Sequence, residues 1–302
     1  MYNKAVKISV VINTRNESGN IERAIASIKS FADEIIVVDM ESSDDTVKKA
    51  KKAGAVVYPH KNTQYVEPAR NFAIKKATGD WIFILDADEE VQPALAKELK
   101  KIAKEGKYHF VRIPRKNIIF GKWMEHARWW PDYNIRFFKK NAVTWDDEIH
   151  SIPITVGDGI NLEENVSLAI IHHNYQTVEQ YLDRLNRYTT VQAEHLSKIK
   201  NVTARDFIVR PSSEFLTRYF AGHGYKDGMH GLALSLLQSF SELIVVAKAW
   251  QKNGFSETEA PLREVTKALK ETQKEINYWS AHAHLEEGGS VVDQVKRKFK
   301  LP

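Results

Sequence analysis

The possible folds of this chain are narrowed most by five apolar residues that lead directly into a cluster of carboxylates. The run Trp81–Leu85 is continuously apolar, as expected of a parallel strand that is covered on both faces of its sheet. Asp86 and Asp88 follow it, and residues two apart in an extended chain point to the same side. Such a pair at the end of a buried strand suits Mg²⁺ or Mn²⁺ held together with substrate phosphates. The alternative is a solvated corner whose acids cap the following helix.

Short strands alternate with short helices on both sides of this point. Apolar residues at positions 21, 24, 25 and 28 recur at helical spacing, for example. Alternating strands and helices imply a parallel sheet built by right-handed crossovers, so the polar residues that follow the strands should share one edge. We predict strands at residues 7–14, 34–38, 54–58 and 81–85, and helices at 21–28, 47–53 and 69–77.

Four short motifs occur in order along this segment: Thr14-Arg15-Asn16-Glu17, Val38–Thr46, Ala69-Arg70-Asn71 and Leu85-Asp86-Ala87-Asp88-Glu89. Together they resemble the signature blocks of family 2 glycosyltransferases with the GT-A fold, especially the branch that includes bacterial lipopolysaccharide core glucosyltransferases. The second block departs from the family pattern at Glu41 and Asp45, where glycine or small residues are more usual. The resemblance predicts the α/β class: a Rossmann-like, mostly parallel sheet flanked by helices over residues 1–175, and an α-helical C-terminal region over residues 176–302.

The resemblance also assigns roles along the expected edge. Thr14 and Glu17 are expected against the nucleotide, and Asp39 at the uracil or the ribose. Asp88 is expected to hold the divalent cation, while Asp86 faces the ribose or reaches the metal through water. A carboxylate can accept hydrogen bonds from a ribose diol, and the cation offsets the charge of the diphosphate. The predicted donor-binding residues are Thr14, Arg15, Glu17, Asp39, Arg70, Asp86 and Ala87.

A second cluster, Asp147, Glu148 and His150, follows Trp145. Inverting transfer needs a general base that takes the proton from the acceptor hydroxyl as it attacks the anomeric carbon. The resembling enzymes often have His followed by Glu here, whereas this chain has His150 followed by Ser151. We therefore predict Glu148 or Asp147 as the base and His150 as a ligand of the metal or the diphosphate. The alternative is a solvated acidic loop.

Four further candidates have plain alternatives. Arg70 has a rigid donor fork suited to the base or the pyrophosphate, but it could also be a surface residue of a basic helix. Trp129 and Trp130 could stack on an acceptor sugar, although Trp is also common in cores and interfaces. His172 could reach the metal or the diphosphate, but paired histidines also occur as structural residues.

Composition limits the partners and the compartment. The chain has 302 residues, no cysteine and a formal charge of +5, without a basic stripe of the kind that nucleic-acid binders carry. The absence of cysteine suits a reducing cytoplasm, and no signal peptide is evident before the first strand. We predict a cytoplasmic protein that does not bind nucleic acid. Basic residues near the C-terminus favour contact with anionic lipid or lipopolysaccharide, or simply form solvated helix faces.

The C-terminal region contains a long apolar helix, predicted over Leu232–Trp250. Gln238, Glu242 and Lys248 interrupt it, which argues against a membrane span, because a central acid costs roughly 2.5–3.5 kcal/mol on insertion scales. Three roles remain open for this helix: burial in a core, an oligomer contact, or an interfacial helix that brings the enzyme to a lipid-linked acceptor.

The function predicted from the sequence is inverting, metal-dependent transfer of a hexose. The resemblance implies glucose from a UDP-sugar as the transferred group, Mg²⁺ or Mn²⁺ as cofactor, and a glycan or glycolipid such as lipopolysaccharide core as acceptor. A sugar nucleotidyltransferase is one alternative, but it would carry a Gly-rich basic loop after the first strand, which Thr14-Arg15-Asn16-Glu17 is not. A non-catalytic sugar-nucleotide-binding protein on the same fold is the other.

Overall fold

The computed structural model describes residues 5–62, 67–145, 153–256 and 260–302. The chain divides into two compact units, which we call the sheet unit and the helical unit. The predicted boundary at residue 175 assigns residues 119–130 to the catalytic domain, whereas the structure groups them with the helices. The sheet unit consists of Met1–Ile118 and Pro131–Asn174, and the helical unit of Ile119–Trp130 and Tyr175–Pro302.

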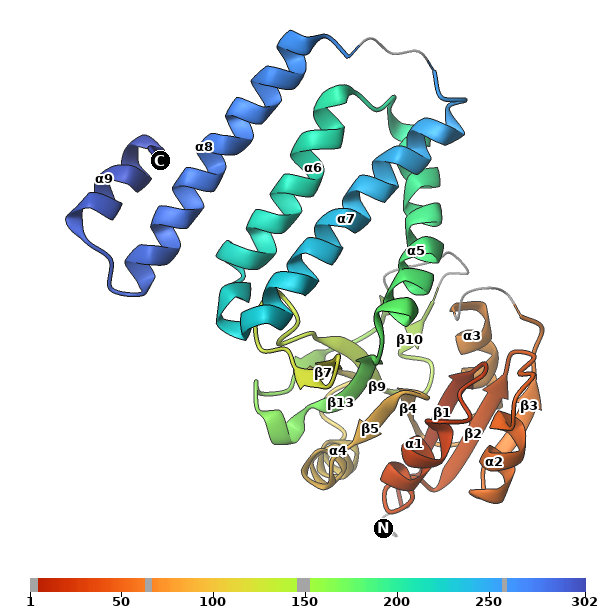
Figure 1. Ribbon diagram of the computed structural model, residues 1–302. Helices are drawn as coiled ribbons and strands as arrows, with labels where there is room; N and C mark the ends of the chain where they lie inside the picture. The colour runs from red at the N-terminus through yellow and green to blue at the C-terminus, as the bar shows by residue number, and fades with distance from the viewer. Residues whose placement is uncertain (1–4, 63–66, 146–152, 257–259) are drawn as a thin grey trace. The chain divides into compact units, whose positions relative to one another are not determined.

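A seven-stranded sheet forms the centre of the sheet unit. Its strands are β1 (Ile8–Thr14), β2 (Glu34–Asp39), β3 (Val56–Pro59), β4 (Trp81–Asp86), β6 (Phe110–Ile113), β9 (Asn134–Lys139) and β12 (Gly159–Asn161). They lie in the order β12-β6-β9-β4-β1-β2-β3. Figure 1 labels β9, β4, β1, β2 and β3 of this sheet. All neighbours are parallel except β9, which runs antiparallel to both β4 and β6. The predicted α/β class, a mostly parallel sheet flanked by helices, is confirmed.

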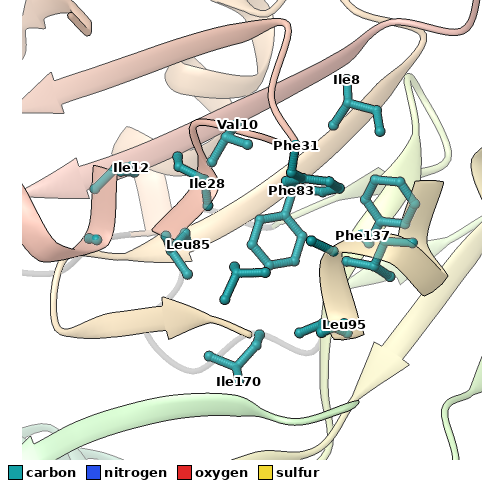
Figure 2. Close-up of a cluster of buried hydrophobic side chains, with 14 of the residues drawn as sticks. Ile8, Val10, Ile12, Ile28, Phe31, Phe83, Leu85, Leu95, Phe137 and Ile170 are labelled. Atoms are coloured by element: carbon teal, nitrogen blue, oxygen red, sulfur yellow. The ribbon is translucent and has the colours of Figure 1, made fainter. Parts of the chain in front are cut away.

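Helices cover both faces of this sheet because alternate strand residues point to opposite sides. Val10 and Ile12 of β1 pack in one hydrophobic cluster with residues of three helices. Val11 packs in a second cluster with residues of a fourth helix. Figure 2 shows the first cluster, in which Phe31 and Phe83 meet edge to face with centroids 5.5 Å apart. The helices are α1 (Ile21–Ile28), α2 (Thr46–Lys52) and α4 (Pro93–Glu105) on the first face, and α3 (Glu67–Lys76) on the second.

A smaller sheet continues from the end of β4. Strands β5 (Glu89–Val91), β13 (Ile170–Tyr175) and β7 (Arg115–Ile119) lie in the order β5-β13-β7. β13 runs antiparallel to β5 and pairs His172 with Glu89, so a residue far along the chain comes next to the carboxylates that follow β4. The remaining short elements of the sheet unit are the paired strands β10 (Val143–Thr144) and β11 (Ile154–Thr155) and the turn η1 (Val166–Leu168).

The helical unit consists mainly of packed helices. α5 and α6 pack against α7, and α8 packs against α6 and α9 (Figure 1). The start of α7 lies so close to the preceding turn that a Cβ on Gly231 would stand 1.8 Å from the carbonyl oxygen of Gly224. The elements are β8 (Lys122–Trp123), α5 (Val178–Ile199), α6 (Ala204–Leu216), η2 (Thr217–Ala221), η3 (Gly224–Asp227), α7 (Gly228–Lys252), α8 (Leu262–Glu286) and α9 (Val291–Phe299).

The polar residues that interrupt the apolar run of α7 are bonded to neighbouring helices. Gln238 donates to the Tyr181 hydroxyl at 2.7 Å, and Glu242 accepts from Arg210 at 2.7 Å. Lys248 donates to the backbone oxygen of residue 186 on α5 at 2.6 Å. By length and hydropathy the segment Gly224–Lys252 could cross a membrane, but core helices pass the same test. These bonds favour a role for α7 within the helical unit.

Candidate active site

The carboxyl ends of β1, β2 and β4 meet at one edge of the seven-stranded sheet. Thr14 pairs with Asp39 on β2, and Asn13 pairs with Asp86 on β4. Because adjacent strands lie about 4.8 Å apart, these four residues occupy neighbouring positions along the edge. The structure therefore brings together three residues that the sequence nominates for donor binding, namely Thr14, Asp39 and Asp86.

Buried polar atoms without protein partners cluster at this edge. Both amide atoms of Asn13, the hydroxyl of Thr14 and one carboxylate oxygen of Asp39 have no hydrogen-bond partner among the described residues. The three residues are only 6%, 2% and 8% exposed, respectively. An unsatisfied buried donor or acceptor costs about 1–3 kcal/mol, and the great majority of such groups in proteins are paired. These atoms suit a polar ligand such as a base or a ribose.

The loops that follow β1 and β2 are tied to each other beside these atoms. The Asn16 N–H donates to the Ser42 hydroxyl at 2.8 Å, and the Ser43 N–H donates to the Asn16 side-chain oxygen at 2.8 Å. Glu17 joins the same contact, since its N–H donates to the Thr46 hydroxyl at 2.8 Å. The two loops thus hold one fixed arrangement at the edge.

The departure from the family pattern at Glu41 has a structural counterpart. Glu41 has a φ of 61°, in the left-handed region that glycine adopts without a steric penalty. A glycine or another small residue at this turn would therefore be favoured by backbone geometry. In this chain Glu41 adopts the conformation in spite of its side chain.

A series of ion pairs begins at Asp86. Its carboxylate accepts from Arg136 at 2.5 Å and from Arg70 at 3.4 Å. Arg136 also donates to Glu89 at 2.8 Å, and Glu89 lies 3.5 Å from Arg115. Arg136 is 3% exposed and Glu89 is fully buried. Since buried charges are stable only when paired, these residues depend on one another.

The same series continues to Asp88. Arg115 donates to Asp132 at 2.6 Å, and the Asn117 amide donates to Asp132 at 3.1 Å. The oxygen of that amide bonds to Nδ1 of His172 at 2.7 Å. Nε2 of His172 then lies 3.6 Å from the Asp88 carboxylate. We call the nine residues from Arg70 and Asp86 to Asp88 the charge chain; they are Arg70, Asp86, Arg136, Glu89, Arg115, Asp132, Asn117, His172 and Asp88.

The charge chain distinguishes the two carboxylates of the DxD pair. Burial alone would raise the pKa of Asp86, but the charges of Arg136 and Arg70 outweigh it and hold that pKa well below its usual value. Both oxygens of Asp86 bond to guanidinium groups, an arrangement that suits an ion pair better than a metal ligand. Asp88 instead faces an imidazole, so it is the better placed of the two to bind a cation.

His172 is oriented as a metal ligand would be. Its Nδ1 is hydrogen-bonded to the Asn117 oxygen at 2.7 Å, so Nε2 is the ring nitrogen that faces Asp88. Neutral imidazole and carboxylate both bind divalent metals, and a partner such as Asn117 fixes the ring. The sequence nominated His172 for the metal or the diphosphate, and pairing with β5 brings it beside the DxD pair.

The chain's own residues fit a cation that shares its ligands with substrate. Across residues 5–62, 67–145, 153–256 and 260–302, no three His, Cys, Asp or Glu side chains converge as a metal cage. Asp88 and His172 would supply two ligands to such a cation. Mg²⁺ in nucleotide enzymes usually takes one or two protein carboxylates and completes its shell with substrate phosphates and water. The donor set therefore matches a cation bound together with a diphosphate.

The segment nominated for the base is anchored at its start. The Asn71 amide donates to the Trp145 carbonyl at 2.6 Å and accepts from the Trp145 N–H at 3.2 Å. Arg70, one residue earlier on α3, places its guanidinium 5.8 Å from the centre of the Trp145 ring. These contacts fix the position of Trp145. The nominated residues Asp147, Glu148 and His150 lie outside the residues that the structure describes.

The other nominated residues lie in different surroundings. Arg15 is exposed, and Ala87 is 4% exposed in the turn after β4. Trp129 and Trp130 belong to the helical unit, where Arg218 lies 5.4 Å from the centre of the Trp129 ring and Trp130 meets another Trp edge to face. A role for Trp129 and Trp130 in acceptor binding stays a prediction.

Sequence reasoning missed several members of the site. Asn13 and Arg136 are the clearest, and each leaves a signal that could have been used. Asn13 is a polar residue inside the apolar strand β1, and Arg136 stands alone among apolar neighbours on β9. A single polar residue within a buried strand must find a partner or a ligand. The other members missed were Glu89, Arg115, Asp132 and Asn117.

Comparison with known proteins bears on this site. Residues 9–156 match the model of the family described as glycosyl transferase family 2. An uncharacterized glycosyltransferase of Rickettsia typhi is 30% identical over 80% of this chain and 86% of that protein. The lipopolysaccharide core biosynthesis glycosyltransferase LpsC of Rhizobium meliloti is 23% identical over 82% and 93%, respectively. The glucosyl-3-phosphoglycerate synthase of Mycobacterium tuberculosis, solved with Mn²⁺ and UDP-glucose, is 26% identical over 36% of this chain and 44% of that chain, with a TM-score of 0.33.

Proposed function

The chain belongs to the family 2 glycosyltransferases, and from that premise we propose that it transfers a hexose from a UDP-sugar to a hydroxyl of a glycan or glycolipid, with inversion at the anomeric carbon. The observation that carries the proposal is the group of buried polar atoms on Asn13, Thr14 and Asp39, next to the DxD pair, that find no hydrogen-bond partner among the described residues. A nucleoside offers hydroxyl and amide groups that would satisfy them.

Each of these side chains has a distinct part in donor binding. Asp39 accepts the Ser42 N–H at 3.2 Å with one oxygen, so its other oxygen is left for the ribose or the uracil. Asn13 offers both a donor and an acceptor, which matches the edge of a uracil. Arg70 holds Asp86 through Nη2, while its buried Nε has no partner in the described part of the chain. That group suits the base or the diphosphate, and Thr14, Arg15, Glu17 and Ala87 complete the proposed donor site.

Asp88 and His172 would hold the divalent cation. The bound cation would neutralise the diphosphate as it leaves the anomeric carbon. Asp86 has a different part in this proposal, because its carboxylate holds Arg136 and Arg70 in place at the strand ends. The charge chain then fixes both carboxylates of the DxD pair before the donor arrives. Such preorganisation avoids a cost at the moment of reaction.

Glu148 or Asp147 would remove the proton from the acceptor hydroxyl, with His150 at the metal or the diphosphate. Two points support this assignment. The reaction needs a base on the face of the sugar opposite the leaving group, and carboxylates are already ionised at neutral pH. In addition, Trp145 is anchored to α3 next to Arg70, so the segment starts close to the donor edge.

We assign lipopolysaccharide core or a related glycolipid as the acceptor class. The name of LpsC, which matches over most of both chains, supports this class. A lipid-linked acceptor and a cytoplasmic sugar nucleotide would meet at the inner face of the membrane, so we place the enzyme in the cytoplasm with peripheral access to that surface. Trp129 and Trp130 are the proposed platform for the acceptor sugar.

The function is tested by release of UDP from UDP-glucose with Mn²⁺ and a lipopolysaccharide core acceptor. Asp88→Asn should lower the rate at least about 100-fold, because a lost metal ligand removes several kcal/mol of charge stabilisation. Asp158→Asn, which makes the same chemical change at an exposed position of the sheet unit, should leave the rate unchanged. Equal activity of Asp88→Asn and the wild type would contradict the metal assignment. UDP binding without release on any acceptor would indicate a non-catalytic sugar-nucleotide-binding protein.

A further inference from the structure

The last helix of the chain presents its apolar side to solvent. α9 spans nine residues, and the described chain buries none of them. Val291, Val292, Val295 and Phe299 are 72%, 60%, 45% and 62% exposed. At about 100° per residue these four positions fall on one arc of the helix. A surface helix of a globular protein normally turns such a face toward the core, so this orientation is inverted.

The polar side of α9 makes the contacts with α8. Arg297 lies 3.3 Å from His282, and Asp293 lies 3.7 Å from His284. The backbone oxygen of Lys300 accepts from an amide of α8 at 3.0 Å. α9 lies beside α8 (Figure 1), and the four side chains of its apolar arc remain largely exposed.

Cationic residues flank the apolar arc. Around the helix, Lys296 lies at one border of the apolar arc and Lys298 at the other. A cleft of about 680 Å³ beside the helix is lined by Tyr278, Leu285, Gln294, Arg297, Lys298 and Lys300, of which Lys300 pairs with Glu275 at 2.5 Å. Long lysine side chains can extend their ammonium groups to a polar layer while their stems cover apolar surface. An apolar arc between lysines is the pattern of helices that lie in a membrane interface.

We propose that α9 is a membrane-binding helix, which inserts Val291, Val292, Val295 and Phe299 shallowly into a bilayer whose anionic phospholipid headgroups meet Lys296 and Lys298. Charge complementarity selects this occupant over a second copy of the chain, because a symmetric pair would bring lysines of like charge together. The area that α9 could bury also argues against a second copy of the chain. Four side chains of a nine-residue helix fall far short of the roughly 800 Å² per partner that a stable interface buries.

Vesicle flotation with the full chain tests this helix directly. The vesicles contain phosphatidylcholine alone, or phosphatidylcholine with about a third phosphatidylglycerol as the anionic lipid. The wild type should float with the anionic vesicles and not with the neutral ones, and high salt should weaken the binding. Lys296→Gln with Lys298→Gln should lower the partition coefficient roughly ten- to thirtyfold, since each lysine near an anionic surface contributes about 1 kcal/mol. Val295→Ser with Phe299→Ser should lower it at least tenfold through lost apolar burial.

Matched controls separate the role of α9 from general charge and hydrophobicity. Leu262→Ser with Leu269→Ser removes two exposed apolar residues from α8, and Lys48→Gln with Lys101→Gln removes the same charge from exposed positions of the sheet unit. Both control pairs should bind as the wild type does. Absence of wild-type binding, or equal binding by the α9 pairs, would overturn the proposal. Loss of a dimer in the α9 pairs, with vesicle binding unchanged, would assign the face to a second copy and would overturn it as well.

Discussion

Glu89 is the residue on which the buried part of the charge chain depends most. It is fully buried, and it faces Arg136 at 2.8 Å and Arg115 at 3.5 Å. Glu89→Gln would leave the buried Arg136 and the partly buried Arg115 short of negative charge. Breaking a buried ion pair by removing one partner typically costs about 3–5 kcal/mol. We expect a loss of that size in the free energy of unfolding, measured by urea titration.

The matched control for this variant is Glu98→Gln. Glu98 makes an exposed pair with Lys101 on α4, and such pairs contribute at most about 1 kcal/mol. The control should unfold within about 0.5 kcal/mol of the wild type. A similar, small change in the free energy of unfolding of both variants would show that Glu89 does not stabilise the charge chain more than an exposed pair does.

Asp132 should make stability depend on pH in a defined direction. Burial raises its pKa, but the Arg115 charge and the hydrogen bond from Asn117 outweigh burial and hold the pKa below its usual value. A carboxylate with a lowered folded-state pKa stabilises the fold above its unfolded pKa of about 3.9, and this contribution is lost as the pH falls below that value. The difference in unfolding free energy between wild type and Asp132→Asn should therefore be constant above about pH 5 and shrink below about pH 4. A difference that persists unchanged at pH 3 would contradict this assignment.

A site residue could be predicted from the sequence when its position depends on the local pattern, and not when it depends on a partner far along the chain. Thr14, Asp39, Asp86 and Asp88 follow apolar runs directly, so their place at the strand ends can be inferred from local pattern. The partner of Asp86 is Arg136, fifty residues away, and it is found only when β9 is known to lie beside β4. Strand order is a long-range property that a local pattern does not encode.

At the scale of elements, the strands with strong apolar runs were predicted to within a residue or two. The strand predicted over 81–85 is β4 at Trp81–Asp86, and that predicted over 7–14 is β1 at Ile8–Thr14. The segment after Ile113 was harder, because β7 and β8 contain charged and polar residues whose neighbours lie far along the chain. The inverted orientation of α9 depends on contacts with α8 that no local pattern contains.

The start of α7 should tolerate no side chain at Gly231. A Cβ there would stand 1.8 Å from the Gly224 carbonyl oxygen, so the η3 turn and α7 would have to move apart. Forcing extra volume into a packed contact typically costs about 1–3 kcal/mol, and we expect Gly231→Ala to lower stability by at least that amount in thermal unfolding. Gly19→Ala is the control, since no described atom lies within 4 Å of its added Cβ. Equal stability of the two variants would contradict the close approach.

At the scale of the whole chain, the two units of the structure differ from the two regions predicted from the sequence, 1–175 and 176–302. Residues 119–130 interrupt the sheet unit, and Ile119 and Met124 are covered by Tyr181, Leu185 and Leu234 of the helical unit. The apolar pattern of these residues shows that they are buried, but not which helix covers them. The family assignment was predictable because four motifs lie in one continuous segment, whereas the unit boundary depends on a segment that returns to distant helices.

This division predicts the behaviour of a truncated chain. A fragment of residues 1–175 ends before α5 and leaves Ile119 and Met124 without their cover. We expect it to aggregate or to bind the dye ANS strongly, because exposed apolar surface drives both. Size exclusion and dye fluorescence, compared with the full chain, provide the measurement. A monomeric fragment that unfolds cooperatively and does not increase ANS fluorescence would mean that residues 119–130 are stable without the helices that cover them.

The central claim is that the strand ends of the sheet unit bind a nucleoside diphosphate together with a divalent cation. Calorimetric titration of the full chain with UDP, in the presence of Mn²⁺ and then of a chelator, tests it most directly. We predict that UDP binds with Mn²⁺, that the chelator weakens binding at least about tenfold, and that Asp88→Asn reproduces this loss in the presence of Mn²⁺. UDP binding of equal strength in the chelator and in Asp88→Asn, or no binding under any of these conditions, would contradict the account.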